Sequence, residues 1–141
     1  MSLLISTNAI ANVAFYYGNH PPQDELRWFD TVVITPDSPF NPRDFNSAQN
    51  KALAYLSVGE APPNVSRTLP SNAIIGKNTI WKSDVLDISN PAWQNYLMHE
   101  VDNLMQQGYQ GFFLDTLDSY QLAAKTPADK EKQVTALVSL I

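Results

Sequence analysis

Short, continuous apolar runs recur along the chain, and each is followed by polar or proline-containing sequence. A parallel strand is buried on both faces, so it appears as an apolar run rather than as an alternation of apolar and polar residues. The runs therefore predict strands of a parallel sheet. They are Asn12–Tyr17, Thr31–Thr35, Ala52–Val58, either Ala73–Ile75 or Val85–Ile88, and Gly111–Leu114.

Helical patterns separate some of these runs, and the clearest covers Asn90–Gln107. We expect Asn90 to be its N-cap, Pro91 its first helical residue and Gly108 the residue that ends it. Apolar side chains at helical spacing predict one buried stripe along this helix. The stripe consists of Trp93, Leu97, Val101, Leu104 and Met105.

Two further helices are expected, in Pro21–Asp30 and Pro127–Ile141, because each segment opens with proline followed by acidic residues. Ala61–Asn72 is expected to be a loop. Alternation of strands and helices predicts a single α/β domain with parallel strands over residues 1–141. Two architectures remain open. An open flavodoxin-like sheet suits a chain of 141 residues, whereas a complete (β/α)₈ barrel takes about 250.

Composition excludes several classes of function. The net charge is −5, from 9 Lys and Arg against 14 Asp and Glu, so a nucleic-acid partner is not expected. Without cysteine the chain has no disulfide and no thiolate ligand or nucleophile. His20 and His99 lack partners at ligand spacing and no glycine-rich phosphate loop occurs, so we expect no metal and no cofactor. No apolar stretch approaches the ~20 residues of a membrane span.

The first residues, MSLLISTNAIANVAFYYG, do not form an intact signal peptide, because they lack a positively charged start and a long apolar run. Two interpretations remain. Either a leader has been removed and residues 1–11 are its remnant or a tag, or the protein is cytosolic and never carried one.

Acidic or aromatic residues close every candidate strand. In α/β folds the carboxyl ends of parallel strands carry the site. Asp37, in TPDSP, is interpreted as an ordinary turn residue. The other residues at these ends are Tyr16, Tyr17, Ser57, Glu60, Asp87, Asp115 and Asp118.

Asp115, in GFFLDTLDSYQ, is the strongest candidate catalytic residue. It follows four apolar residues of an interior strand, where a carboxylate needs a partner, a metal or a catalytic role. Glu60 is either a solvated charge after the Gly59 turn or a site residue. Asp87 is either a site residue or part of an ion pair or N-cap, and Asp118 either caps the next helix or lines the site. A cleft rich in carboxylates and aromatic rings suits carbohydrate, because acids transfer protons and rings stack on sugar faces.

The segments NVAFYYG, YLSVGE, W..DVLDISNPAWQ and GFFLDTLDSY, in this order, resemble glycoside hydrolase family 114, the endo-α-1,4-polygalactosaminidases. The resemblance covers roughly residues 12–122, and the opening VAFYYGNHPPQDELRWFDTVVITPD is most similar to the Pel-type hydrolase domains of that family. It implies an extracytoplasmic, periplasmic or secreted (β/α)₈ barrel that cleaves cationic, galactosamine-rich exopolysaccharide. An acidic pI of about 4.7 fits a cationic polymer.

The resemblance also assigns roles to residues. It implies that Asp115, after the fifth strand, is one member of the catalytic carboxylate pair. The positions that match groove residues of the family are Tyr16, Tyr55, Ser57, Glu60, Asp87, Asp118 and Tyr120.

The second catalytic carboxylate of the family lies on a later strand, and no residue up to Ile141 matches it. The chain is therefore expected to be the N-terminal part of a barrel, with about five strands. Such a part exposes strand edges, so we expect a homodimer or pairing with the missing C-terminal half. Two alternatives to a glycosidase are a non-catalytic carbohydrate-binding or interaction module and a flavodoxin-like domain that binds a divalent cation. The Tyr-Tyr-Gly end of the first strand argues against the last of these.

Overall fold

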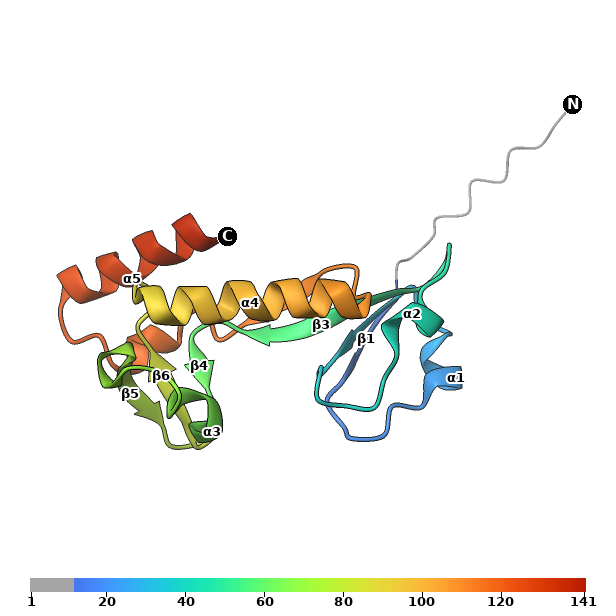
Figure 1. The fold of residues 1–141 in the computed structure, drawn as a ribbon, viewed down its shortest axis with the longest axis horizontal. Coiled ribbons are helices and arrows are strands. Elements are labelled where there is room, and N and C mark those ends of the chain that lie inside the picture. The colour runs from blue at the N-terminus through green and yellow to red at the C-terminus, as the bar shows by residue number, and fades with distance from the viewer. Residues whose placement is uncertain (1–11) are drawn as a thin grey trace, which may run out of the picture.

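The computed structural model describes residues 12–141, and its main feature is a four-stranded parallel sheet (Figure 1). The sheet has the order β1-β2-β3-β7, with every neighbouring pair parallel. Its strands are β1 (Val13–Tyr16), β2 (Thr31–Ile34), β3 (Lys51–Ser57) and β7 (Phe112–Asp115). The predicted α/β class is thus confirmed, with four parallel strands in place of about five.

The missing strand is accounted for by a second, antiparallel sheet with the order β4-β6-β5. Its strands are β4 (Glu60–Ala61), β5 (Ile74–Asn78) and β6 (Ser83–Leu86). The expectation that one of the runs Ala73–Ile75 and Val85–Ile88 joins the parallel sheet was wrong. A turn of residues 79–82 joins β5 to β6, and so short a connection permits only antiparallel pairing.

The long helix α4 (Pro91–Gln107) runs along the long axis of the molecule (Figure 1) and has the predicted ends. The Asn90 side chain accepts a hydrogen bond from the backbone N–H of Ala92 at 2.9 Å. Gly108 ends the helix at φ 107°, a left-handed conformation that favours glycine. Met105 was wrongly expected in the buried stripe. It is 51% exposed, because one residue beyond Leu104 rotates a side chain by about 100° around the helix.

The remaining helices are short, apart from the last one. Helix α1 is shorter than the expected Pro21–Asp30, and the expected loop Ala61–Asn72 contains one helical turn and the start of a second. In the described residues no helix is both long and apolar enough to cross a bilayer. The helices other than α4 are α1 (Gln23–Leu26), α2 (Pro42–Phe45), α3 (Pro63–Ser66), η1 (Ser71–Ala73), η2 (Ser119–Leu122) and α5 (Pro127–Leu140).

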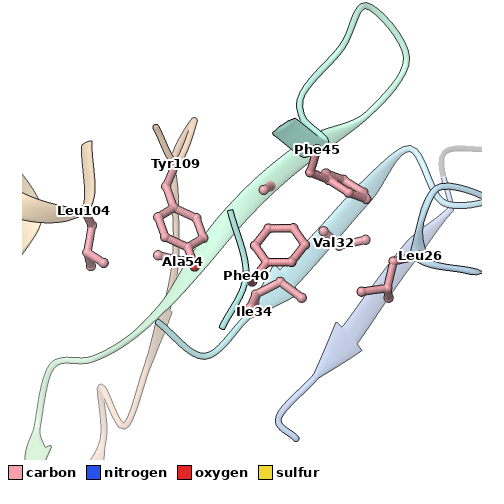
Figure 2. Packing of buried hydrophobic residues seen from close by; sticks show 9 residues of the cluster. Leu26, Val32, Ile34, Phe40, Phe45, Ala54, Leu104 and Tyr109 are labelled. Atoms are coloured by element: carbon pink, nitrogen blue, oxygen red, sulfur yellow. The ribbon is translucent and has the colours of Figure 1, made fainter. Parts of the chain in front are cut away.

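One face of the parallel sheet packs against the main core (Figure 2). Because side chains alternate along a strand, this outer face takes alternate residues of β2 and β3, such as Val32, Ile34 and Ala54. The rings of Phe40 and Phe45 cover them, with centroids 5.3 Å apart. A second cluster joins α4, through Trp93 and Leu97, to Leu137 and Leu140 of α5.

The opposite face of the sheet, which we call the inner face, carries a row of aromatic rings. Phe15 of β1 meets Phe113 of β7 edge to face, with centroids 5.0 Å apart. Phe113 stacks on Tyr55 of β3 at 6.4 Å, and Tyr55 meets Tyr17 at 5.4 Å. Phe15 is 49% exposed, whereas Val33 between the rings is 1% exposed. The row leads toward the carboxyl ends of the strands.

Candidate active site

A pocket of about 500 Å³ opens where β3 and β7 end. This volume lies within the range of about 300–1,000 Å³ typical of small-molecule sites. A second pocket, of about 230 Å³ and lined by Asp87, Lys132 and Gln133 among others, is smaller. The lining of the larger pocket comes from both sheets and from the segments that join them. The lining residues are Tyr17, Thr35, Tyr55, Ser57, Glu60, Ala61, Pro62, Trp81, Ser83, Asp115 and Thr116.

Asp115 is the last residue of β7, and its carboxylate belongs to this pocket. The hydroxyl of Tyr55 donates a hydrogen bond to Asp115 Oδ2 at 2.6 Å. Burial raises the pKa of Tyr55, and the hydrogen bond to Asp115 raises this pKa further. The phenol therefore stays protonated at neutral pH and holds one carboxylate oxygen, while the other oxygen has no hydrogen-bond donor among the described residues.

The backbone after Asp115 is held in an uncommon conformation. Thr116 has φ 61°, in the left-handed region that residues with a branched side chain rarely adopt. Its Oγ1 accepts from the N–H of Gly59 at 2.9 Å and lies 2.8 Å from Ser57 Oγ. A Cβ on Gly59 would come within 2.1 Å of the Thr116 carbonyl oxygen, so only glycine permits this approach. Backbone strain of this kind is concentrated at functional sites.

Glu60 is the second carboxylate in the pocket lining, but it is only 5% exposed. Its Oε1 accepts from Asn78 Nδ2 at 2.9 Å and from Ser119 Oγ at 2.5 Å, and the Ser83 hydroxyl donates to its Oε2. Burial by itself raises the pKa of Glu60, but the three hydrogen bonds outweigh burial and lower this pKa below its usual value. Glu60 is therefore ionised and fully engaged by neutral donors.

The electrostatics of the pocket are one-sided. Two carboxylates, Glu60 and Asp115, line it, and no lysine, arginine or histidine does. Charge in a cleft with low-dielectric walls concentrates the field, so this cleft attracts cations. No group of three or more histidine, aspartate or glutamate residues that could hold a metal ion occurs in the described part of the chain.

Four of the eight predicted site residues line this pocket: Tyr55, Ser57, Glu60 and Asp115. Ser57 Oγ also donates to the carbonyl oxygen of Glu60 at 2.8 Å, so its hydroxyl is occupied by the fold. The structure does not bring Tyr16, Asp87, Asp118 or Tyr120 into the pocket lining.

Tyr16 lies on the outer face of the sheet, where its ring packs against the main core. Its hydroxyl donates to the His20 carbonyl oxygen at 2.7 Å. Asp118 is the N-cap of η2, but its side chain makes no capping hydrogen bond, and Tyr120 lies within that helix. These three residues are close to the pocket in sequence and separated from its lining by the alternation of side chains or by the turn into η2.

Asp87 has the structural role that was one of its two interpretations from the sequence, because it forms an ion pair and side-chain hydrogen bonds. It is 9% exposed and accepts hydrogen bonds from Ser89 Oγ at 2.5 Å, Gln133 Nε2 at 2.7 Å and Lys132 Nζ at 2.9 Å. Burial alone raises the pKa of Asp87, but these donors overcome burial and lower the pKa. The carboxylate thereby fastens α5 to the segment between β6 and α4, beside the smaller pocket.

Four lining residues with functional side chains were not predicted: Thr35, Trp81, Ser83 and Thr116. Tyr17 was predicted to lie at a strand end but was not among the expected groove residues. Tyr17 and Thr35 lie two residues beyond Phe15 and Val33 of the inner face, so the period of two along a strand contains this signal. Trp81 and Ser83 come from the β5–β6 turn and from the start of β6, and the sequence gives no sign that this hairpin folds over the ends of the parallel strands.

Comparison with known proteins identifies the family and the fold that this chain resembles. Residues 5–141 match the model of glycoside-hydrolase family GH114. The glycoside hydrolase domain of PelA from Pseudomonas aeruginosa superposes with a TM-score of 0.81 at 36% identity, covering 92% of this chain and 53% of that one. Ega3 from Aspergillus fumigatus, in complex with galactosamine, gives a TM-score of 0.74 at 16% identity, covering 92% and 55%.

Curated relatives add distant matches. An uncharacterized protein of Deinococcus radiodurans is 24% identical over 75% of this chain and 39% of its own length. Uncharacterized protein MJ1477 of Methanocaldococcus jannaschii is 24% identical over 63% and 28%. The chain thus spans about half of the solved structures and a smaller share of these relatives.

Proposed function

The chain belongs to glycoside hydrolase family GH114, and from this premise we propose that it acts on cationic, galactosamine-rich polysaccharide, with Asp115 as the nucleophile or general base. One observation carries the proposal. Asp115 ends the parallel strand β7, which lies at the edge of the described sheet and not in its interior as the sequence suggested, in a pocket without basic residues, and Tyr55 holds one of its oxygens at 2.6 Å. The other oxygen is available for a sugar carbon or a water, as glycosidase chemistry requires.

The substrate class follows from charge and from relatives. Two carboxylates face a pocket in a chain of net charge −5, which favours a ligand with ammonium groups. The PelA domain, at 36% identity, is described as a glycoside hydrolase, and Ega3 is described in complex with galactosamine. A polysaccharide of this kind lies outside the cell, so we propose an extracytoplasmic site of action, periplasmic or secreted, in a biofilm exopolysaccharide.

Glu60 is unsuited to be the partner of Asp115. A glycosidase acid must carry a proton at the working pH, which requires a raised pKa, whereas the pKa of Glu60 is lowered. All three of its donors would also have to be released. We therefore infer that the second carboxylate comes from strands beyond those described. A separation of about 5–5.5 Å from Asp115 would give retention and about 6.5–9.5 Å inversion.

The exposure of the inner face supports the proposal that further barrel strands belong beside this sheet. Strands β1 and β7 each have one unpaired edge in the sheet, and the aromatic row between them includes Phe15 at 49% exposure. In a closed (β/α)₈ barrel, further strands would cover this face. For the 141-residue chain alone we expect a homodimer through the inner face, to be checked by the mass in solution from light scattering.

The test of the proposed function is cleavage of polygalactosamine by this chain together with the further barrel strands that carry the second carboxylate, followed by the appearance of reducing ends. We expect Asp115→Asn to abolish turnover and Asp102→Asn, on the exposed side of α4, to leave it unchanged. Full activity of Asp115→Asn would overturn the assignment.

A second candidate function is carbohydrate binding without turnover. The observation that favours it is the engagement of Glu60, which leaves Asp115 as the one pocket carboxylate with a free oxygen among the described residues. Binding of galactosamine oligosaccharides without new reducing ends, by this chain together with the further barrel strands, would select this candidate.

A further inference from the structure

The turn between β5 and β6 places a tryptophan at the edge of the pocket. Trp81 is 78% exposed and yet contributes to the pocket lining. Its neighbour Ile80 is 81% exposed and does not line the pocket. Lys82 has φ 55°, so the turn leaves the hairpin through a left-handed residue. The indole thus lies at the mouth of the pocket, with most of its surface free.

Hydrogen bonds hold this turn in place. Asn78 Oδ1 accepts from the backbone N–H groups of Ile80 at 3.1 Å and Trp81 at 3.4 Å, and Asn78 Nδ2 donates to Glu60 Oε1 at 2.9 Å. At the other end of the turn, the Ser83 hydroxyl donates to Glu60 Oε2. Both ends of the turn are therefore bound to one buried carboxylate, so the backbone that carries Trp81 is held in place before a ligand binds, which lowers the entropy lost on binding.

The chemistry of the pocket matches an amino sugar on two counts. An indole offers a large apolar face on which the C–H face of a sugar ring can pack. Tryptophan is also the best aromatic partner for a cation, and an ammonium group near its ring is attracted by the ring quadrupole. Asp115 and Glu60 add negative charge deeper in the same pocket, so a cationic sugar finds attraction at the mouth and at the base.

We propose that Trp81 is the sugar-stacking residue at the mouth of this pocket, and that Glu60 is a positioning residue for the β5–β6 turn and does not contact the sugar. This inference rests on the proposed function for its ligand, an α-1,4-linked galactosamine oligosaccharide. It differs from the expectation that Glu60 contacts substrate, and it adds a specificity residue from outside the parallel sheet.

The test measures affinity for a deacetylated α-1,4-galactosamine pentasaccharide by calorimetry, using the full chain with Asp115→Asn to prevent cleavage. We expect Trp81→Ala to weaken binding about 5- to 30-fold, the range that aromatic–cation contacts support, and Trp81→Phe to weaken it less. Two matched controls should bind within twofold of the parent. They are Ile80→Ala, the adjacent exposed residue, and Trp28→Ala, a tryptophan that is 79% exposed and outside the pocket.

Glu60→Gln separates positioning from direct binding. The amide keeps an acceptor oxygen for the turn but removes the charge, so a positioning role predicts only the loss of long-range attraction, a weakening of at most about fivefold that disappears at high salt. In a double-mutant cycle, Asn78→Ala should weaken binding when Trp81 is present and have no further effect in the Trp81→Ala background. Additive losses, or a large loss in Glu60→Gln, would overturn the positioning role.

The outcomes also distinguish this inference from the proposed function. If Trp81→Ala binds as tightly as its parent, the stacking role is wrong. That result leaves the proposed function untouched, because the effect of Asp115→Asn on cleavage tests it separately. If neither the wild type at 4 °C nor the parent variant binds the pentasaccharide, the proposed function and this inference fail together. Because Trp81 is mostly exposed, circular dichroism should show an unchanged fold for each substitution at this position.

Discussion

Replacing Glu60 should reveal how strongly the second sheet is fastened to the parallel one. Glu60 is 5% exposed and accepts hydrogen bonds from Asn78, Ser83 and Ser119. Glu60→Ala removes the common acceptor of three buried or half-buried donors, each worth about 1–3 kcal/mol when left unsatisfied. Hydroxyl groups can rotate toward other acceptors, so we expect a loss of about 3–5 kcal/mol in the free energy of unfolding. Glu60→Gln keeps one acceptor oxygen and should cost about 1 kcal/mol at pH 7.

The pH dependence of these variants gives the sharper test. The pKa of Glu60 is lowered in the folded state, so its ionisation contributes stability above the unfolded value of about 4.3. This contribution is lost as the pH falls through the folded pKa. The difference in unfolding free energy between wild type and Glu60→Gln should therefore be largest above pH 5 and shrink toward pH 3.

Urea unfolding at pH 7, 5, 4 and 3, followed by far-ultraviolet circular dichroism, measures this difference. Glu131→Gln, which changes an exposed glutamate on α5, is the matched control and should stay within about 0.5 kcal/mol of wild type at every pH. A wild-type-to-Glu60→Gln difference that does not change between pH 6 and pH 3 would refute the claim that ionisation of Glu60 supports the fold.

Two further predictions concern the other carboxylates. Tyr55→Phe deletes the 2.6 Å donor to Asp115, so kcat/KM on polygalactosamine should fall about 10-fold or more, equally from pH 6 to 9 because the raised pKa keeps the Tyr55 hydroxyl protonated throughout. An unchanged kcat/KM would contradict the role of this hydrogen bond. Asp87→Asn should lower the free energy of unfolding by about 1–3 kcal/mol at pH 7 by loosening α5. Because the pKa of Asp87 is lowered, this loss should shrink as the pH falls below about 4, and equal losses at pH 7 and pH 3 in urea titrations would contradict it.

The parallel sheet and its main helix were predictable because local signals determine them. Continuous apolar runs identified β1, β2, β3 and β7, and the Asn90–Pro91 start and Gly108 end located α4. The antiparallel hairpin was missed because its runs are as apolar as those of the parallel strands. What separates the two cases is the four-residue connection of residues 79–82, which is too short for a crossover.

The site was predictable where a residue ends a parallel strand on the inner face. Asp115 and Ser57 satisfy this condition, since they end β7 and β3 and are paired in the register, and Tyr55 lies two residues earlier on the same face. Tyr16 does not satisfy it, because one residue along a strand changes the face, and Tyr17 takes the place expected for it. Asp87 follows a strand of the antiparallel sheet, so the rule for parallel strand ends never applied to it.

The two pocket carboxylates have different environments, and this difference argues for different roles. Glu60 is surrounded by neutral donors that leave it ionised and immobile, which suits a residue that fixes the β5–β6 turn and adds fixed negative charge. Among the described residues Asp115 has a single side-chain donor, Tyr55, and the residue after it, Thr116, has φ 61° and accepts a hydrogen bond from the N–H of Gly59. A carboxylate with one oxygen oriented and one free can attack or activate, whereas one with both oxygens engaged cannot. On this comparison, the proposed acid partner of Asp115 is a third carboxyl group, in a site that raises its pKa.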